Sequence, residues 1–525
     1  MSAPQSQDAA SSKLLHPEVL GDHFEGAHDA DGRPLVHAEA TSRPIREPVQ
    51  QEPQPRGAKD RGHRPVDPVE AAGRFVTATI HEKAHDERLW DGRLRRDAAA
   101  HALPEWEAMR AIASATKEHT LAHLGQYLAQ FEAAAEANGV IVHWAEDAAE
   151  HNRIVHDILR THGAKTLIKS KSMLTDECGF RAYMKGVGIE VIETDLGERI
   201  QQLDNEEPSH ITGPAIHKTR ADVAKVFAST LGSDPTADDI HKLATVQRDT
   251  TRPYILAAGA GMTGCNFAVA ETGTVVVCTN EGNADLSANT PPLHIVSMGI
   301  EKLVPTLAHL TVFVRLLARN AIGTPLTQYT SHFRAPRPGT QMHYVIVDNG
   351  RSARLGLAEF WTSLKCIRCA ACMNTCPVYR RSGGLSYGAT YSGPIGVILS
   401  PTFDRAKYSA LPFVSTLNGS CTNVCPVKIN IHEQIFAWRR VMAEEHRIPL
   451  AKAELMRTMG YVLAHPTLYR TAIAAADEVL RWLPHFVIEN RFNTWSSKGR
   501  DTPNAPKQTF HSWWYQNRIK GGKSA

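Results

Sequence analysis

The chain has 525 residues, long enough for two or three domains, and its 58 Lys and Arg nearly balance its 55 Asp and Glu. This balance argues against nucleic acid or an anionic membrane as the main partner. The sequence holds no run of about eighteen uncharged apolar residues, so no membrane span is expected. Its N-terminus shows no basic stretch followed by an apolar one, so we expect no secretory signal and predict a cytoplasmic protein.

Residues 1–66 are polar, rich in Pro and poor in aromatic residues, as in "ATSRPIREPVQQEPQPRGAKD". Such a stretch buries too little apolar surface to offset its conformational entropy. We therefore predict a disordered leader.

Residues 67–354 are predicted to form an α/β domain that begins with helices. Between residues 105 and 139 apolar residues recur three and four apart, and this helical run closes on Asn138-Gly139. Further along, short β-branched runs alternate with helical stretches, which indicates a mixed, largely parallel sheet. Gly273 separates two of these runs and predicts an antiparallel hairpin. The expected strands are 165–169, 189–193, 210–214, 266–271, 274–279, 293–298 and 343–348, and helices are expected at 219–229 and 301–319.

Residues 355–440 hold six of the nine cysteines, spaced as metal ligands, and are predicted to form a helical iron–sulfur module. Nine cysteines in a chain of this length do not make a disulfide framework. Residues 441–525 are predicted to be helical to about residue 490 and to end in an irregular tail.

The first cysteine motif is "KCIRCAACMNTCPVYR", residues 365–380. Its C-x2-C-x2-C-x3-C-P spacing places three thiolates around one [4Fe–4S] cluster and sends the fourth to another cluster. A structural zinc ribbon would instead show paired C-x2-C knuckles. The spacing therefore predicts an iron–sulfur site, and the cysteines of this motif are Cys366, Cys369, Cys372 and Cys376.

The second motif, "STLNGSCTNVCPV" at residues 415–427, keeps only part of this pattern. Aligning its final Cys-Pro with that of the first motif places Ser415, Asn418 and Cys421 at the three preceding ligand positions. Cross-ligation by the last cysteine of this motif completes the first cluster. The predicted ligands of the first cluster are Cys366, Cys369, Cys372 and Cys425.

A second cluster would draw on Cys376 and Cys421 alone, because neutral Ser and Asn oxygens are poor ligands for cluster iron. It would assemble only with water, an exogenous ligand or a residue from elsewhere in the chain. The remaining cysteines, whose alternative reading is that of small buried apolar residues, are Cys178, Cys265 and Cys278. One cluster is therefore expected, and a second stays open.

Two polar loops at the expected hairpin ends, "AETGT" (270–274) and "TNEGN" (279–283), are candidates for a substrate pocket, since binding groups gather on loops beside a rigid sheet. The alternative is turn chemistry, which favours the same residue types. "KSKS" (169–172) and "HKTR" (217–220) could likewise hold an anion or end a strand in solvent. The candidate substrate-binding residues are Glu271, Thr272, Asn280, Glu281 and Asn283.

Several stretches in a fixed order resemble the lactate-utilisation protein B (LutB) family of iron–sulfur proteins, over roughly residues 100–510. Among them are "KSKSMLTDECGF", "PSHITGPAIHKTR", "GMTGCNFAVAETGTVVVCTNEGN", "LKCIRCAACMNTCPVYR" and "CPVKINIHEQI". The resemblance implies a lactate-utilisation (LUD) domain, similar to the sugar-phosphate isomerase and CoA-transferase superfamily, joined to a ferredoxin-like module. The family's second motif is usually C-x2-C-x3-C-P, and Asn418 stands where the first of those cysteines is expected.

The resemblance also implies a function: electron transfer within an NAD-independent complex that oxidises L-lactate, or another 2-hydroxy acid, to the keto acid. Two partner proteins are implied, a small LUD-domain protein and a cysteine-rich iron–sulfur protein. Two other functions stay open from the residues themselves. One is a structural or assembly role with a bracing cluster, and the other is an isomerase or transferase working through the LUD domain.

Overall fold

The computed structural model describes residues 65–482, 484, 487, 490 and 506–520. The predicted leader, residues 1–66, lies outside these residues except for its last two. The chain divides into two compact units, Met1–Val441 and Met442–Ala525.

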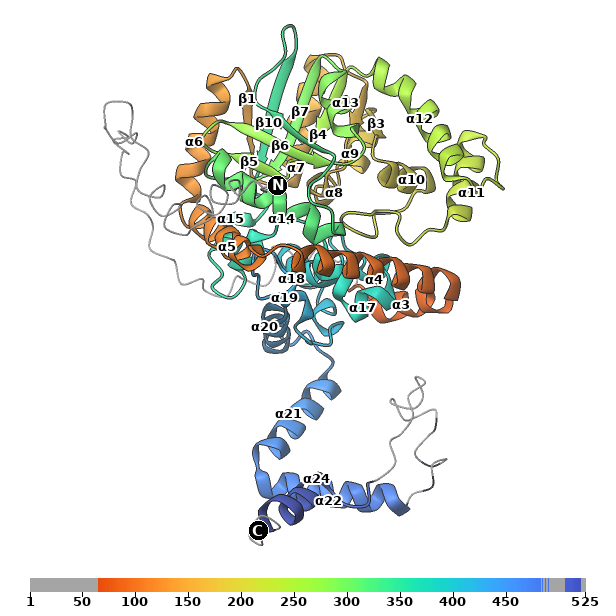
Figure 1. Cartoon of the computed structure of the whole chain (residues 1–525), viewed down its shortest axis with the longest axis vertical. Helices are drawn as coiled ribbons and strands as arrows, with labels where there is room; N and C mark the ends of the chain where they lie inside the picture. The colour runs from red at the N-terminus through yellow and green to blue at the C-terminus, as the bar shows by residue number, and fades with distance from the viewer. Residues whose placement is uncertain (1–64, 483, 485–486, 488–489, 491–505, 521–525) are drawn as a thin grey trace, which may run out of the picture. The chain divides into compact units, whose positions relative to one another are not determined.

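The centre of the first unit is a six-stranded sheet with the strand order β1-β10-β7-β4-β2-β3, in which every neighbouring pair is parallel (Figure 1). The expected sheet was mixed and largely parallel, whereas the structure has this wholly parallel sheet and a second sheet that contains the antiparallel pairs. A parallel sheet is covered on both faces, so its strands are near-continuous apolar runs. The strands are β1 Ile141–Ala145, β2 Thr166–Lys169, β3 Glu190–Glu193, β4 Ala260–Thr263, β7 Leu293–Gly299 and β10 Gln341–Val347.

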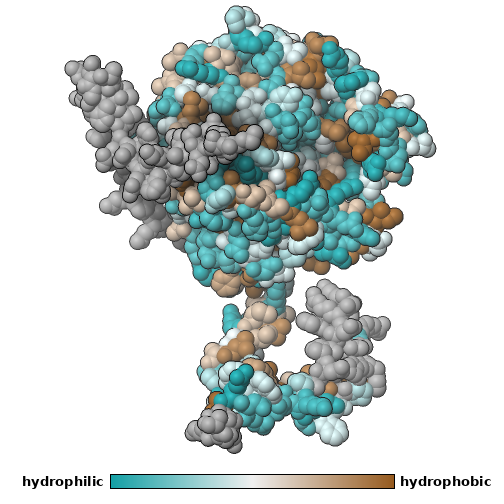
Figure 2. Space-filling view, viewed as in Figure 1, coloured by the Kyte–Doolittle hydropathy of each residue, from teal (hydrophilic) through white to brown (hydrophobic). Residues whose placement is uncertain are grey.

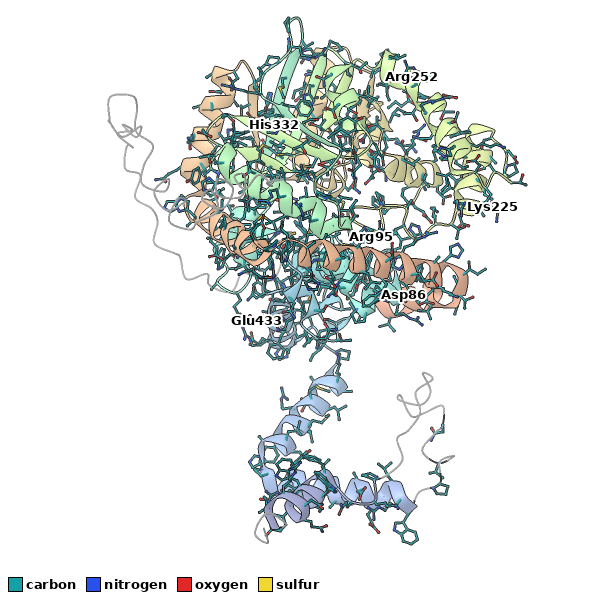
Figure 3. All side chains as sticks on the ribbon, viewed as in Figure 1. Asp86, Arg95, Lys225, Arg252, His332 and Glu433 are labelled. Atoms are coloured by element: carbon teal, nitrogen blue, oxygen red, sulfur yellow. The ribbon has the colours of Figure 1, made fainter. Side chains whose placement is uncertain are left out.

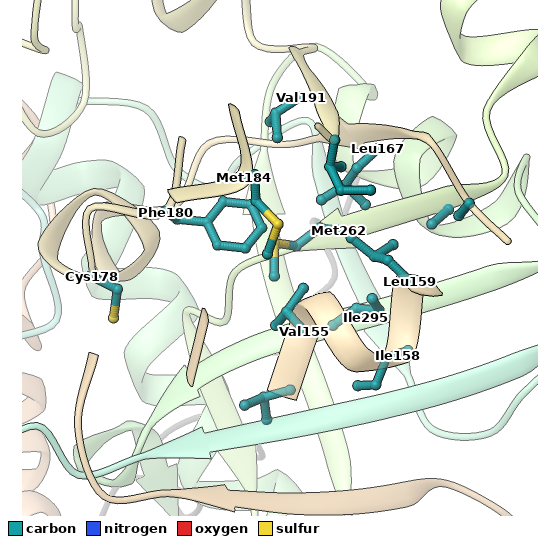
Figure 4. Packing of buried hydrophobic residues seen from close by; sticks show 14 of the residues in the cluster. Val155, Ile158, Leu159, Leu167, Cys178, Phe180, Met184, Val191, Met262 and Ile295 are labelled. Carbon is teal, nitrogen blue, oxygen red and sulfur yellow. The ribbon is translucent and has the colours of Figure 1, made fainter. Parts of the chain in front are cut away.

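Alternating side chains of the central strands enter two different cores. On β7, Ile295 packs into one core with helices α7 (Ala148–Thr161) and α9 (Phe180–Gly186), as Figure 4 shows. Its neighbour Val296 enters the opposite core, with α6 (Leu124–Ala137) and the second sheet. This two-residue period is what a strand buried on both faces requires.

The second sheet has the order β8-β5-β6-β9 and contains the predicted hairpin, since β5 and β6 pair antiparallel with Ala268 opposite Val275. Gly273, in the hairpin turn, has a φ of 64°, and a Cβ there would stand 2.4 Å from the backbone nitrogen of Ala135 on α6. Only Gly fits this close approach. The strands of this sheet are β5 Phe267–Val269, β6 Thr274–Thr279, β8 Leu303–Val304 and β9 Tyr329–Phe333.

Two sequence predictions fail locally. The strand expected at 210–214 is a turn, in which the Ser209 N–H donates to the carbonyl of Pro214 and the buried His210 ring accepts from the Gly213 N–H. The helix expected at 301–319 begins later, as α14 at Leu307, because residues 303–304 pair with β5 and the Thr306 side chain caps the helix.

The remaining helices of the LUD portion pack on the sheets or on one another, and the predicted helical end at Asn138-Gly139 is confirmed. These helices are α5 Trp106–Ala122, α8 Met173–Glu177, α10 Leu196–Asp204, α11 Arg220–Leu231, α12 Ile240–Ala257, α13 Asn283–Asn289, α14 Leu307–Ile322 and α15 Arg351–Leu355.

The cysteine-bearing segment folds into short helices that pack against α3 (Pro68–Thr77) and α4 (Thr79–His101). Asp86 of α4, labelled in Figure 3, pairs with Arg380 at 2.7 Å. The N-terminal helices, assigned from sequence to the α/β domain, therefore also support the iron–sulfur module. Its helices are α16 Ala371–Thr375, α17 Pro377–Ser382, α18 Gly393–Phe403, α19 Ser420–Asn423 and α20 Ile431–Glu444.

The second unit contains α21 Leu450–Ala464, α22 Pro466–Trp482 and α24 Phe510–Trp514. Neither α21 nor α22 has a buried residue, and the apolar side chains they expose appear brown among the hydrophilic ones in Figure 2. Within the described residues, no helix is long and apolar enough to cross a bilayer.

Candidate iron–sulfur site and adjoining cavity

Four cysteines from both motifs line one small, apolar-walled cavity: Cys366, Cys369, Cys372 and Cys425. Cys366 and Cys369 lie in a loop in which Arg368 and Ala370 have positive φ angles of 62° and 63°, and Cys372 lies at the start of α16. Non-glycine residues seldom adopt this conformation, and here it alternates with the cysteines. The structure thus brings together the four residues predicted as the ligands of the first cluster.

N–H donors surround the buried sulfurs of this site. The Arg368 N–H donates to Cys366 Sγ and the Ile429 N–H to Cys425 Sγ, both at 3.4 Å. Asn320 of α14 donates its Nδ2–H to Cys369 Sγ at 3.3 Å. Burial raises the pKa of the Cys425 thiol to about 12, with the neighbouring Cys369 adding to the effect.

Such buried neighbouring thiols ionise together only when a cationic centre holds them, which fits iron–sulfur ligation. Each thiolate of a [4Fe–4S] cluster binds a different iron, so the sulfurs stand farther apart than around one ion. The described part of the chain shows no group of three or more His, Cys, Asp or Glu that could hold a metal ion, so the assignment of these cysteines rests on their spacing and their shared cavity.

The second predicted site has two thiols, Cys376 and Cys421, whose proximity contributes to raising the Cys421 pKa to about 11, after burial. Ser415 Oγ accepts from the Leu417 N–H at 3.2 Å, and Asn418 Oδ1 accepts from the Ser420 N–H at 3.1 Å. Both oxygens thus serve the turns of their own segment.

The other three cysteines lie elsewhere. Cys178 belongs to the apolar core beside Phe180 and Met184 (Figure 4), and its pKa is raised far above the ordinary value by burial. Cys265 and Cys278 line a cavity in the LUD portion. The alternative reading of Cys178 as a buried apolar residue is the one that the structure supports.

This second cavity, of about 280 Å³, lies at the carboxyl ends of three parallel strands. Residues 170–172 follow β2, residues 264–266 follow β4, and Ser297 and Gly299 end β7. The carboxyl edge of a parallel sheet is where ligands of open α/β folds bind. We refer to it as the LUD cavity.

Three of the five candidate substrate residues line the LUD cavity: Asn280, Glu281 and Asn283. Glu271 and Thr272 do not, which corrects the expectation of one shared pocket. They lie in the turn at the other end of β6, six residues long and so roughly 20 Å away. There Glu271 Oε2 accepts from the Leu307 N–H at 3.1 Å, and Thr272 Oγ1 donates to Thr274 Oγ1.

The polar side chains at the cavity also perform turn chemistry, as the alternative reading held. Asn280 Oδ1 accepts from the Gln328 N–H at 3.0 Å, and Asn283 Oδ1 accepts from Thr279 Oγ1 at 2.8 Å. Glu281 Oε2 accepts from the Leu196 N–H at 3.3 Å, and burial raises the pKa of this carboxyl.

Of the two other candidate anion sites, residues 169–172 and 217–220, only the first lines the LUD cavity. Lys169 forms a fully buried ion pair with Glu193 at 3.0 Å, whereas residues 170–172 line the LUD cavity. His217 and Lys218 instead pair with Glu206, at 3.2 and 2.8 Å.

A buried charge network, which was not predicted from the sequence, lines part of the LUD cavity. We call this part, formed by Glu301, Lys302, Arg351 and Arg368, the inner end of the cavity. Arg351, at the start of α15, donates to Glu301 Oε2 at 2.6 Å. It also donates to both carboxylate oxygens of Glu177, at 2.8 and 3.0 Å. Tyr391 donates its O–H to Glu177 Oε2 at 2.6 Å. Burial alone would raise the Glu301 pKa, but Arg351, Lys302 and Arg368 hold it well below its usual range.

Arg368 connects this network to the cluster site. Its side chain lies over the Tyr391 ring at 4.3 Å and stands 3.7 Å from Glu301 Oε1. The residue lines both the LUD cavity and the cavity of the four cysteines. Glu177 and Arg368 stand in two of the family-like stretches quoted above, but the separation of the network's residues along the chain gives no signal that they meet.

Comparison with known proteins agrees with this architecture. The profile of the LUD domain matches residues 128–350, and that of the 4Fe-4S dicluster domain matches residues 362–429. A crystal structure of a duf162 family protein from Deinococcus radiodurans covers 43% of this chain and 98% of its own, at 14% identity. Its TM-score of 0.25 is too low to establish a shared fold.

Curated relatives match over most of both chains. "Lactate utilization protein B" of Oceanobacillus iheyensis is 40% identical over 82% of this chain and 92% of its own. The protein of the same name from Macrococcus caseolyticus is 42% identical over 80% and 90%. That of Geobacillus thermodenitrificans is 40% identical over 82% and 92%. With a LUD domain followed by an iron–sulfur domain, and with these relatives along most of its length, the chain belongs to the lactate utilization protein B family.

Proposed function

We propose that this chain is the iron–sulfur electron-transfer subunit of an NAD-independent complex that oxidises L-lactate to pyruvate. The names of its relatives point to lactate utilisation. The observation that carries the electron-transfer role is Arg368, which lines both the LUD cavity and the cysteine cavity. A molecule in the LUD cavity is therefore next to the segment, residues 366–372, that carries three of the cluster's cysteines.

Cys366, Cys369, Cys372 and Cys425 hold the cluster in this proposal, and it supplies one-electron transfer when bound. The protein's own residues tune and shield that site. Asn320 and backbone N–H groups donate to the sulfurs, and apolar residues such as Ile395 and Val427 keep water away. Asn280, Glu281 and Asn283 would line the substrate's side of the cavity.

The proposal includes two partner proteins, a small LUD-domain protein and a cysteine-rich iron–sulfur protein, and a cytoplasmic location. A second cluster at Cys376 and Cys421 is not needed for it. If a second cluster assembled, both clusters would lie in the same helical module.

The test is reduction of the cluster by L-lactate. The full chain, purified anaerobically, is mixed with the two partner proteins and L-lactate, and cluster reduction is followed by electron paramagnetic resonance. We expect a reduced-cluster signal with L-lactate and none when either a partner protein or lactate is omitted. An oxidised cluster in the complete mixture, when dithionite reduces it readily, would overturn the proposal.

A second candidate, a bracing cluster, is favoured by the contacts around Cys425. Arg110 of α5 donates to the carbonyls of Cys425 and Asn423 at 2.8 and 2.7 Å, and Arg96 of α4 donates to that of Val424 at 3.3 Å. A cluster there would tie three segments together without any change of redox state. The same experiment separates the two, because a bracing cluster would stay oxidised with lactate.

A further inference from the structure

We propose that the inner end of the LUD cavity is a carboxylate-binding subsite, in which Arg368 and Lys302 bind the carboxylate of a small 2-hydroxy or 2-keto acid beside the first cluster. This deepens the proposed function by naming the residues that recognise the acid. Neither residue was predicted from the sequence as a binding residue.

The Arg368 guanidinium is buried but only partly used. One of its faces covers the Tyr391 ring, and its Nη2 stands 3.7 Å from Glu301 Oε1. Its Nη1 is buried and has no hydrogen-bond partner in the structure. A buried N–H without an acceptor is costly, and a carboxylate is the acceptor that the planar guanidinium matches best.

Arg351, by contrast, is fully engaged. Its Nε and both Nη atoms donate to the carboxylates of Glu301 and Glu177. Because Glu301 lies 2.6 Å from Arg351, its charge is largely committed there, and the more distant Arg368 keeps an unbalanced positive charge. Arg351 is thus a positioning residue that holds Glu301, and Arg368 is the residue left to meet a ligand.

Lys302 adds a second positive charge to the same wall. It lies at the end of the short helical turn Ile300–Lys302, which follows β7, and it lines the LUD cavity. Its ionisable neighbours are Glu301, Arg368 and the thiols of Cys265 and Cys366. Among the described residues its ammonium has no hydrogen-bond or ion-pair partner, and a half-buried ammonium favours an anion beside it.

Three acidic residues line the cavity, and one of them, Glu301, is already paired with Arg351 at 2.6 Å. The other two, Asp195 and Glu281, are charged neighbours of each other, and Glu281 also lies near Lys171. An anion entering the cavity is therefore drawn to the end that adjoins the cluster. The volume of about 280 Å³ suits a metabolite of a few heavy atoms better than a nucleotide or a larger cofactor.

The test is equilibrium binding of pyruvate to the full chain, purified anaerobically with its iron, in isothermal titration calorimetry. Pyruvamide, which has the same shape without the charge, is the matched ligand. We expect pyruvate to bind at least about tenfold more tightly than pyruvamide, since a hydrogen bond to a charged group contributes that much. Equal affinity for the two, or no pyruvate binding, would overturn the subsite.

Lys302→Met is the decisive variant, because within the described part of the chain the Lys302 side chain has no hydrogen bond or ion pair to lose. We expect it to weaken pyruvate binding about tenfold or more while iron content stays that of the wild type. Lys225→Met, on the exposed face of α11 (Figure 3), is the matched control and should bind as the wild type does. Unchanged affinity in Lys302→Met would contradict the proposal.

Arg368→Gln tests the second residue, with iron content measured first because Arg368 lies between two cluster cysteines. A variant that keeps its iron and loses pyruvate binding supports the subsite, and one that keeps both overturns the role of Arg368. These measurements need no partner protein and no electron transfer. Pyruvate binding without lactate-dependent cluster reduction would therefore contradict the proposed function alone.

Discussion

The backbone at Arg368 and Ala370 passes twice through the left-handed region, and this local geometry sets the functions of the loop. It turns the thiols of Cys366 and Cys369 to one side, into the cysteine cavity, while Arg368 also reaches the LUD cavity. A cysteine spacing alone predicts ligands, but it does not say that the residue between them contacts another site.

The cross-ligation at Cys425 predicts a contrast between two serine variants. Cys425→Ser should lose cluster iron about as completely as Cys369→Ser, because both thiols line the same cavity. Cys376→Ser should keep most of the roughly four irons per chain expected for one [4Fe–4S] cluster. Iron and sulfide analysis after anaerobic purification measures the contrast, and equal losses at Cys376 and Cys425 would refute the assignment.

Glu198 gives a prediction for the pH dependence of stability. Both of its carboxylate oxygens are buried without a hydrogen-bond partner. Burial, and then the charges of Asp176 and Glu193, raise its pKa well above the ordinary 4.5. The folded state therefore holds a proton that the unfolded state releases above pH 4.5, and stability falls as pH rises from there toward the folded pKa.

Glu198→Gln removes this dependence. Relative to wild type, the variant should gain stability with rising pH, by up to about 1.4 kcal/mol per pH unit within that window. Melting temperatures of both proteins, measured anaerobically from pH 5 to 8, give the difference. A difference that stays constant or shrinks as pH rises would show that Glu198 is ionised in the folded protein.

At the scale of elements, helices α4 and α14 hold the cluster loop through side chains that meet at Asn320. Arg96 of α4 donates its Nε–H to Asn320 Oδ1 at 2.8 Å. Asn320 in turn donates to Cys369 Sγ at 3.3 Å and to the Val424 carbonyl at 3.1 Å. One amide thus joins the LUD portion to both cysteine motifs.

Asn320→Leu should lower the reduction potential of the cluster. An N–H donated to a sulfur stabilises the more negative, reduced state, so its loss favours the oxidised one. Potentiometric titration followed by electron paramagnetic resonance measures the shift. The control is Asn152→Leu, another buried Asn that donates to the carbonyl of Cys178 and not to a cluster sulfur. An unchanged or raised potential in Asn320→Leu alone would contradict the role of this hydrogen bond.

Much of the element order was predictable because strands such as β2, β6 and β7 are unbroken β-branched or apolar runs bounded by turn residues. β4 was missed because "AGMT" has little β propensity, and its position comes from pairing with β2 and β7. The cluster ligands were predictable from local spacing. The inner wall of the LUD cavity was not, because Lys302, Arg351 and Arg368 are brought together only by the fold.

In the whole molecule, the first unit, Met1–Val441, carries both the cluster site and the LUD cavity. The described chain begins just before Val66, whose N–H donates to the Lys407 carbonyl at 2.9 Å. A truncation at residue 60 would leave this contact in place.

Deleting residues 1–60 should therefore leave iron content and melting temperature close to those of the full chain. The removed segment is too polar to supply a share of an apolar core. Iron analysis and thermal unfolding under argon make the comparison. A large drop in melting temperature would mean that the segment packs on the folded body.

We propose that the LUD cavity and the first cluster form one site, and electron–nuclear double resonance measures whether a bound acid lies beside the cluster. The full chain is reduced with dithionite, saturated with pyruvate carrying ¹³C in its carboxyl group, and examined for hyperfine coupling between that carbon and the cluster spin. We predict a ¹³C coupling in the wild type that disappears in Lys302→Met, whose cluster signal persists. Saturated pyruvate binding without any ¹³C coupling would place the bound acid away from the cluster and contradict a shared site.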